Sequence, residues 1–217
     1  MHVKYFLEFI YVIESYICNI NSVIVYAFLL EPLIYGHSIN EFTTIECIIH
    51  WLLTIITWIT VAFLILRDAR KKLNFQLKGT YEKWNVPAIV ASCILVGLMM
   101  VINFVDIGKL KIVHEFYILG TLKFIFQHLY YLAEVILFTL IIVFGQNFLE
   151  KLFRKKNIPY GGIVMGLSWG LGHWFTKGSI WIGLAGLLLG FLFGTMYLFL
   201  GRDFRKTYIV MALTFII

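Results

Sequence analysis

Long apolar runs fill most of this 217-residue chain, and short segments rich in Lys and Arg separate them. A transmembrane helix needs roughly 20 predominantly apolar residues. Six stretches are candidates for such helices, at residues 9–31, 46–66, 86–105, 116–149, 160–176 and 179–200. The last apolar segment reaches only about half a bilayer as a helix. We therefore predict an all-α fold, a polytopic transmembrane helical bundle with six full spans and a short C-terminal helix.

The composition excludes an ordinary soluble domain. Hydrophobic residues make up 61% of the chain and charged residues 14%, whereas soluble domains average roughly 45–50% and about 25%. No polar stretch is long enough to fold separately, so we expect a single integral membrane domain over 1–217. The net charge of +6 does not indicate nucleic-acid binding, because the Lys and Arg residues lie between apolar runs. Membrane lipids are the expected surroundings.

Three basic clusters follow the second, fourth and sixth predicted spans. They contain Arg67, Arg70, Lys71, Lys72, Lys78 and Lys83, then Lys151, Arg154, Lys155 and Lys156, then Arg202, Arg205 and Lys206. Basic loops of membrane proteins face the cytoplasm. The alternation predicts a multi-pass protein of the cell membrane, with the N-terminus in the cytoplasm and the 32–45 loop outside.

The run 116–149 is too long for one perpendicular span. Two arrangements fit it: a tilted helix that projects from the membrane, or an interfacial piece followed by a span from about residue 124. This span runs inward, so His128 is expected in the outer half of the membrane and Glu134 roughly 9 Å deeper. The fifth span runs outward, which places His173 in the outer half as well, at a depth similar to that of His128.

Glycines recur at every fourth position on one face of each of the last two predicted spans. They are Gly162, Gly166, Gly170, Gly186, Gly190 and Gly194. Small residues on one face let two membrane helices approach closely. His173 lies inside the first of these helices, and an ionisable group at membrane depth indicates a functional site. The alternative is a histidine that is hydrogen-bonded to a carbonyl or lies at the interface beside Trp174.

His173, Glu134 and His128 are the candidate catalytic residues, because a carboxylate and imidazoles supply general acid–base chemistry. His128 and Glu134 lie about 120° apart on their helix, so they form no two-ligand motif. We expect neither a metal nor a cofactor. The alternatives for Glu134 are pairing with Lys123 or with a polar group on another helix, and for His128 a packing or interfacial position.

Three aromatic residues are the candidate substrate-binding residues. They are Trp169, Trp174 and Tyr131. Trp169 precedes His173 by one helical turn and Trp174 follows it directly, which suggests a built pocket around the imidazole. Packing is the alternative for Tyr131.

The Trp169-x-x-x-His173 element and the glycine-rich segment after it resemble the CPBP family, the CAAX-protease and bacteriocin-processing (Abi) membrane proteins. The resemblance covers about residues 116–217. It implies an aromatic-x-x-x-His element at an intramembrane active site. Some relatives in Gram-positive bacteria are implied in lipoprotein N-acylation, an acyltransferase reaction, or in envelope maintenance.

The chain departs from the other two elements of that family. The E-E-x-x-x-R element falls on Ile141-Ile142 and Gln146, or with a shifted register on Ala133-Glu134 and Phe138. The late H-x-x-x-N element falls on Val210 and Thr214. Because a peptidase needs a base for water and a group for the oxyanion, we expect that proteolysis has been lost.

The leading hypothesis is a CPBP-like membrane protein that binds or acts on a lipid-anchored protein or peptide at the outer leaflet, with or without a partner protein. One alternative is an active CAAX-type peptidase that uses Glu134, His128 and His173. The other is a non-enzymatic bacteriocin-immunity or scaffold protein. Whether the protein is an enzyme stays open at this level, and if so it is an acyltransferase component or a peptidase-like hydrolase.

Overall fold

The computed structural model describes residues 2–80 and 84–217. It describes the side chains of these residues except at positions 2–5, 103, 106 and 175–177. Every regular element in these residues is helical. In chain order they are α1 (His2–Ile24), the π-helical η1 (Val25–Leu30), α2 (Glu31–Tyr35), the 3-10 turn η2 (Ile39–Glu41), α3 (Thr44–Leu73), α4 (Val86–Ile107), α5 (Lys111–Phe153), α6 (Tyr160–Met165), the π-helical η3 (Gly166–Gly170), α7 (Leu171–Lys177), α8 (Ile180–Phe199) and α9 (Phe204–Ile216). The all-α prediction is confirmed.

Four helical runs are long and apolar enough to cross a membrane: Phe6–Tyr35, Thr44–Leu73, Lys111–Phe153 and Ile180–Phe199. The first three contain the predicted spans 9–31, 46–66 and 116–149, and the fourth matches the predicted span 179–200 to within one residue at each end. The predicted span 86–105 lies in α4, of which the apolar run Val86–Ile102 is shorter than these four. The predicted span 160–176 is divided among α6, η3 and α7. The predicted short C-terminal helix is α9.

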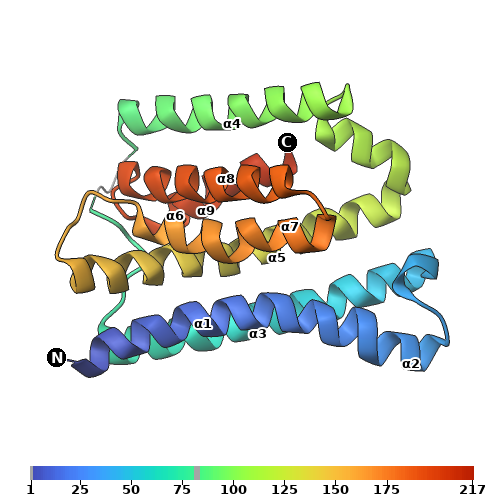
Figure 1. Ribbon diagram of the computed structural model, residues 1–217, viewed down its shortest axis with the longest axis horizontal. Coiled ribbons are helices and arrows are strands. Elements are labelled where there is room, and N and C mark those ends of the chain that lie inside the picture. Colours follow the sequence, from blue (N-terminus) through green and yellow to red (C-terminus); the bar gives the residue numbers. More distant parts are fainter. Residues whose placement is uncertain (1, 81–83) are drawn as a thin grey trace.

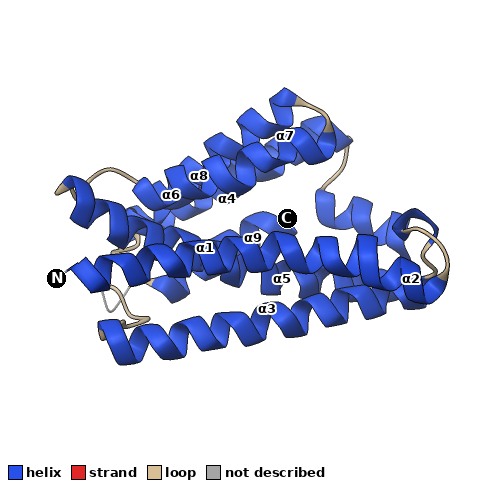
Figure 2. Cartoon of the chain, turned by 60° about the horizontal axis from the view of Figure 1, so that its bottom comes forward, coloured by secondary structure: helices blue, strands red, loops and turns tan. Residues whose placement is uncertain are grey.

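The second half of α5 forms the centre of the molecule. Its residues from Leu137 to Gln146 are all buried. In Figure 1, α1 and α3 lie on one side of α5 and α9, while α4 and α8 lie on the other. Figure 2 shows α3 at one edge of the bundle and α7 and α8 at the opposite edge. A helix that is apolar all round is expected to be buried on every face, and this helix is.

Gly120 divides α5 into two parts, 111–119 and 121–153. Its φ of 71° and ψ of 168° are not helical, and only glycine adopts such a conformation without strain. The break supports the second of the two predicted arrangements, a short piece followed by a span. The short piece is called the leading segment (111–119) below.

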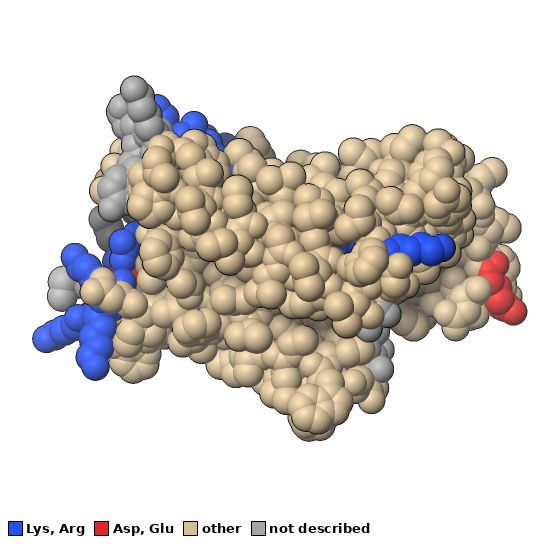
Figure 3. Space-filling view, turned by 90° about the horizontal axis from the view of Figure 1, so that it is seen from above, with Lys and Arg blue, Asp and Glu red and all other residues tan. Residues whose placement is uncertain are grey.

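The two ends of the bundle differ in charge. Loop 74–80, residues 151–158 and the turn 200–203 meet at one end, which is called the basic end. There the Arg202 guanidinium bonds Glu150 at 2.7 Å, and the Thr80 N–H donates to the Gly201 carbonyl at 2.7 Å. Figure 3 shows most of the visible Lys and Arg side chains at this end, and acidic side chains at the opposite tip, with further Lys or Arg atoms on the surface near that tip. This asymmetry is the one that the predicted orientation requires.

The glycine faces pack against each other as predicted. A Cβ added to Gly162 would lie 2.4 Å from the Gly190 oxygen, and one added to Gly170 would lie 2.5 Å from the Gly186 carbonyl carbon. Contacts this short with backbone atoms leave no room for a side chain. The α6–α7 run and α8 are therefore held together by direct backbone contact, which is how small residues stabilise helix pairs in lipid.

Replacing Gly190 by Ala should destabilise the bundle, because the new Cβ would lie 2.5 Å from the Gly166 nitrogen. The expected loss in unfolding free energy is about 1–3 kcal/mol, measured by chemical denaturation in detergent micelles. Gly172→Ala is the matched control, since its Cβ would meet nothing within 4 Å. Equal losses in both variants would contradict the glycine contact.

Asp203 holds the α3–α4 loop onto the basic end. It is 1% exposed and accepts hydrogen bonds from the backbone N–H groups of Gly79 (3.1 Å), Arg205 (2.9 Å) and Lys206 (3.1 Å). Burial acts to raise the pKa of this carboxyl, but the Gly79, Lys206 and Arg205 hydrogen bonds and the Arg205 charge hold the pKa below its usual value. The carboxylate therefore caps α9 and also binds a loop distant in sequence.

Asp203→Ala should lower the unfolding free energy by about 1–2 kcal/mol at neutral pH. Because the folded-state pKa is depressed, this contribution is complete above the unfolded-state pKa of about 4 and is lost as the pH falls through the folded-state value. Denaturation curves of both proteins at pH values from about 6 to about 2 should converge at the acidic end. A difference that does not change with pH would contradict the ionised cap.

Candidate functional site

A polar cluster lies at the end of the bundle opposite the basic end, where the leading segment folds back onto the long part of α5. In a continuous helix Glu115 and His128 would be about 20 Å apart. The His128 Nε2 instead lies 3.8 Å from the Glu115 Oε2. The reversal at Gly120 creates this contact, because it turns the leading segment back toward residues 124–131.

Glu115 is the centre of the cluster. The Tyr131 hydroxyl donates to the Glu115 Oε1 at 3.0 Å, and the Lys111 Nζ lies 4.0 Å from the same oxygen. The Lys111 Nζ also lies 4.6 Å from the centre of the Tyr131 ring and donates to the Phe215 carbonyl of α9. The Gln127 amide donates to the Tyr131 hydroxyl. One carboxylate thus organises a cation, a phenol and an imidazole.

His128 and Glu115 each keep one atom without a hydrogen bond. The His128 Nδ1–H donates to the Phe124 carbonyl at 2.8 Å, so Nε2 is the atom that faces Glu115. His128 Nε2 and Glu115 Oε2 are buried and have no hydrogen-bond partner among the described residues. Buried polar atoms are nearly always hydrogen-bonded. The two atoms, 3.8 Å apart, are therefore the unpaired polar atoms of the cluster.

A cavity of about 330 Å³ opens beside the cluster. Its polar lining comes from Lys111, His114, Glu115 and Thr214. The rest of its wall is apolar and includes Trp169, Leu189 and Phe215. Ligand pockets are commonly of this size and combine an apolar wall with a few placed polar groups. The cavity thus joins an apolar wall to a cation and a carboxylate, Lys111 and Glu115.

The predicted site residues separate into two groups. His128 and Tyr131 belong to the cluster, and Trp169 lines the cavity. His173 lies behind Trp169: its Nδ1–H donates to the Trp169 carbonyl at 2.9 Å, and the two ring centres are 4.3 Å apart. This is the carbonyl-bonded alternative of the sequence analysis. His173 is therefore placed to support Trp169.

Glu134 and Trp174 lie away from the cavity lining. Glu134 faces α1, where its neighbour is Asn19, in agreement with the alternative of a polar group on another helix. Trp174 is 42% exposed, and its Cβ lies where a side chain on Gly183 would fall. Glu134, His128 and His173 thus each face a different neighbour. Within the described part of the chain no three His, Cys, Asp or Glu side chains lie close enough to hold a metal ion.

Gln146, Val210 and Thr214 stand where the CPBP family has catalytic residues, and here they form contacts within the fold. The Gln146 Oε1 accepts from the Gly161 N–H at 2.9 Å, and its Nε2 donates to the Ile158 carbonyl at 2.8 Å. Gln146 thereby joins the end of α5 to the start of α6, at the basic end. Val210 is buried, and the Thr214 hydroxyl donates to the Val210 carbonyl at 2.8 Å.

Sequence reasoning missed Lys111 and Glu115 as site residues. The available signal was a Lys and a Glu four residues apart, followed by Gly120, which lies between this pair and His128. It also missed a buried pair near the same end, in which the Glu31 Oε2 lies 2.7 Å from the His50 Nδ1. That pair joins α2 to α3 and leaves the Glu31 Oε1 without a hydrogen-bond partner in the described structure.

We compared the chain with protein-family models, curated proteins and solved structures, and none of them matches. The resemblance to the CPBP family therefore stays a prediction, and it depends on the Trp169–His173 element and the glycine-rich helix pair.

Glu115→Ala should release the leading segment. The substitution removes the hydrogen bond from Tyr131 and also the carboxylate that Lys111 and His128 face. A hydrogen bond to a charged group contributes about 1.5–3 kcal/mol, so amide exchange in 111–119 should accelerate by about 10–100-fold. Hydrogen–deuterium exchange with mass spectrometry measures this change. Val113→Ala is the control, since Val113 is 41% exposed in the same segment. Equal exchange in wild type and Glu115→Ala would contradict the role of Glu115.

Proposed function

We propose that the protein is a six-span membrane protein with a cytoplasmic N-terminus, and that it binds the polar end of a lipid-anchored protein or peptide at the outer face of the membrane. With the basic end in the cytoplasm, the cavity at Lys111 and Glu115 faces outward. The observation that carries the proposal is the cavity itself, which combines a cation and a carboxylate with a wall of Trp169, Leu189 and Phe215. A lipid-anchored substrate has the same two-part chemistry.

Each side chain has a distinct task in this proposal. Lys111 attracts a carbonyl or anionic oxygen of the substrate head, and Glu115 accepts a hydrogen bond from an amine or amide. The apolar wall holds the start of the lipid chains. Trp169 is fixed from behind by His173, through the 4.3 Å ring contact. Binding thus depends on residues from α5, η3, α8 and α9 together.

Acyl transfer to a substrate amine is a second candidate function, and the His128–Glu115 pair favours it. The transfer breaks the acyl ester bond of a donor lipid as the new amide bond forms, and it requires a base that takes the proton from the amine and passes it to the departing alkoxide of the donor. The His128 Nε2 is the unbonded nitrogen, and the Glu115 carboxylate 3.8 Å away stabilises the imidazolium that results. The peptidase alternative has less support, because its Glu134 faces Asn19 and its His173 bonds Trp169.

Lys111→Gln should reduce binding of a diacylated lipopeptide by about 10–100-fold, the loss expected for a charge-assisted contact. The measurement is photo-crosslinking of a diazirine-labelled lipopeptide to the protein in vesicles of phosphatidylcholine and phosphatidylglycerol. Lys109→Gln is the matched control, because Lys109 is exposed at the same end and lies over the Tyr117 ring. Equal labelling of both variants, or crosslinks at the basic end, would refute the proposed site.

The acyl-transfer candidate has a separate test. In cells that carry His128→Gln or Glu115→Gln in place of the wild type, mass spectrometry of lipoprotein N-termini should show loss of N-acylation. Lys109→Gln should leave it at the wild-type level. Full acylation in all three variants, with lipopeptide binding still dependent on Lys111, would leave binding as the function and rule out acyl transfer.

A further inference from the structure

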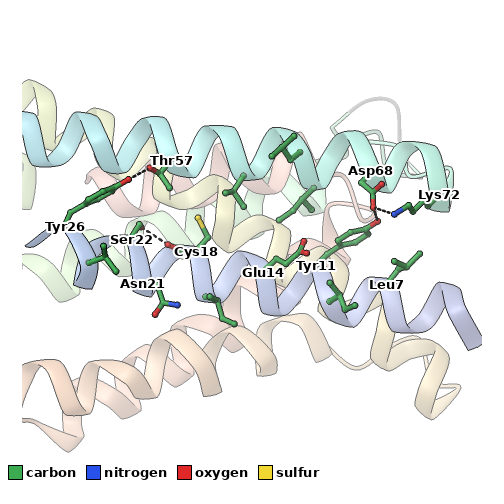
Figure 4. Close-up of a pocket in the computed structure, with 16 residues that line it drawn as sticks. Leu7, Tyr11, Glu14, Cys18, Asn21, Ser22, Tyr26, Thr57, Asp68 and Lys72 are labelled. Atoms are coloured by element: carbon green, nitrogen blue, oxygen red, sulfur yellow. Dashed lines mark hydrogen bonds and ion pairs between the residues drawn. The ribbon is translucent and has the colours of Figure 1, made fainter. Parts of the chain in front are cut away.

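A groove of about 850 Å³ runs between α1 and α3, on the side that faces away from α5 (Figure 4). It is called the α1–α3 groove. Both helices pack against α5 on their other side. Much of the apolar surface of α1 and α3 is exposed, including Ile17 and Leu64 in the groove. The groove thus lies on the membrane-facing surface, apart from the site at Glu115.

The residues that line the groove follow a seven-residue repeat on both walls. Spacings that alternate between four and three residues form a seam that faces another helix. On α1 and the first residue of η1 the repeat comprises Leu7, Tyr11, Glu14, Cys18, Asn21 and Val25. On α3 it comprises Thr57, Val61, Leu64 and Asp68. A third helix can pack between two walls that both have this repeat.

Most polar groups in the groove are paired within its own walls, as Figure 4 shows. The Tyr11 hydroxyl donates to the Asp68 Oδ2 at 2.6 Å, and the Lys72 Nζ lies 2.9 Å from the same oxygen. The Tyr26 and Thr57 hydroxyls are 2.8 Å apart. These pairs satisfy the walls without any ligand.

Glu14 and Asn21 are different. Both side chains are exposed in the groove, and neither forms a side-chain hydrogen bond or ion pair with a described residue. The charges nearest to Glu14 are Asp68 and Lys72, which bind each other, so they leave Glu14 without a cation of its own. Carboxylate and amide groups at membrane depth are costly, and they usually pair with another polar group. The two residues lie seven positions apart, about 10 Å along the helix. They mark the two points where an occupant of the groove must supply a polar partner.

The charges and the spacing select the kind of occupant. Lipid acyl chains offer no hydrogen-bond donor to Asn21. A second copy of the chain, related by a twofold axis along the membrane normal, would bring Glu14 toward Glu14, which is repulsive. A transmembrane helix with a cation at one level and a polar side chain two turns away satisfies both groups. Polar side chains are known to join helices in membranes in this way.

We propose that the α1–α3 groove binds one transmembrane helix of a partner protein, which places a Lys or Arg against Glu14 and a hydrogen-bonding side chain against Asn21. The surface and its partner are independent of the site at Glu115. A negative result for the groove would therefore not refute the proposed function at Glu115, and a negative result at Glu115 would not refute the groove.

The first test uses synthetic transmembrane peptides in phosphatidylcholine vesicles that contain the full-length protein. The probe is a Leu/Ala helix with one Lys and, seven residues away, one Gln, and its binding is measured by energy transfer. We expect this peptide to bind at least tenfold more tightly than the same helix with Leu at both positions. Glu14→Gln and Asn21→Leu should each remove most of that preference, while Glu41→Gln, an exposed acid outside the groove, should not.

Three outcomes would overturn the proposal. One is equal binding of the two peptides, and another is an unchanged preference in Glu14→Gln. The third is self-association of the wild-type protein that Asn21→Leu abolishes, since it would assign the groove to a second copy. Because both side chains are exposed and unpaired, the variants should keep the helical circular dichroism of the wild type.

A second test is made in cells with a photo-crosslinking amino acid at Ile17, which lies in the groove and is 46% exposed. Ile94 on α4, which is 65% exposed, is the control position. The proposal requires that the crosslinked peptide be a transmembrane segment of another protein, with a Lys or Arg at the level of Glu14. Crosslinks only to lipid or to the same chain would overturn it.

Discussion

Packing around the apolar second half of α5 is the interaction on which the rest of the structure depends. This stretch is buried on all faces, and α1, α3, α6 and α9 all lie against it. In a membrane there is no hydrophobic drive between helices, so close van der Waals contact must hold the bundle together. The glycine contacts between the α6–α7 run and α8 extend the same close packing to the far side.

The reversal at Gly120 joins this packing to the candidate site. The core fixes the long part of α5, and the glycine lets the leading segment turn back onto it. Glu115 then meets His128 and Tyr131, while Lys111 reaches the carbonyl of Phe215 on α9. The cavity beside them is lined by side chains from α4, α5, η3, α8 and α9. No single helix contains the site, so its geometry depends on how these five elements pack together.

The α1–α3 groove has its own polar contacts. Across it the Tyr11 hydroxyl and the Lys72 ammonium both bind the Asp68 carboxylate, whereas Glu14 and Asn21 form no side-chain hydrogen bond with a described residue. The cavity beside Glu115 and the α1–α3 groove share no lining residue. The two proposals, a substrate site at one end and a partner surface on one side, are therefore compatible in one protein.

The sequence by itself determined the helical class, the charge asymmetry between the two ends and the glycine faces of 162–170 and 186–194. These properties depend on local hydrophobicity, on loop charge and on a four-residue period, all of which are visible in one chain. It also predicted His128, Tyr131 and Trp169 as site residues, and these three lie at the cluster and its cavity. Only the tertiary structure decided which polar residues meet. Lys111 and Glu115 joined His128 because the backbone reverses at Gly120, and Glu134 faces Asn19 because α1 packs against that side of α5. Contacts between residues distant in sequence depend on where a helix breaks and which face its neighbours cover, and periodicity alone contains neither.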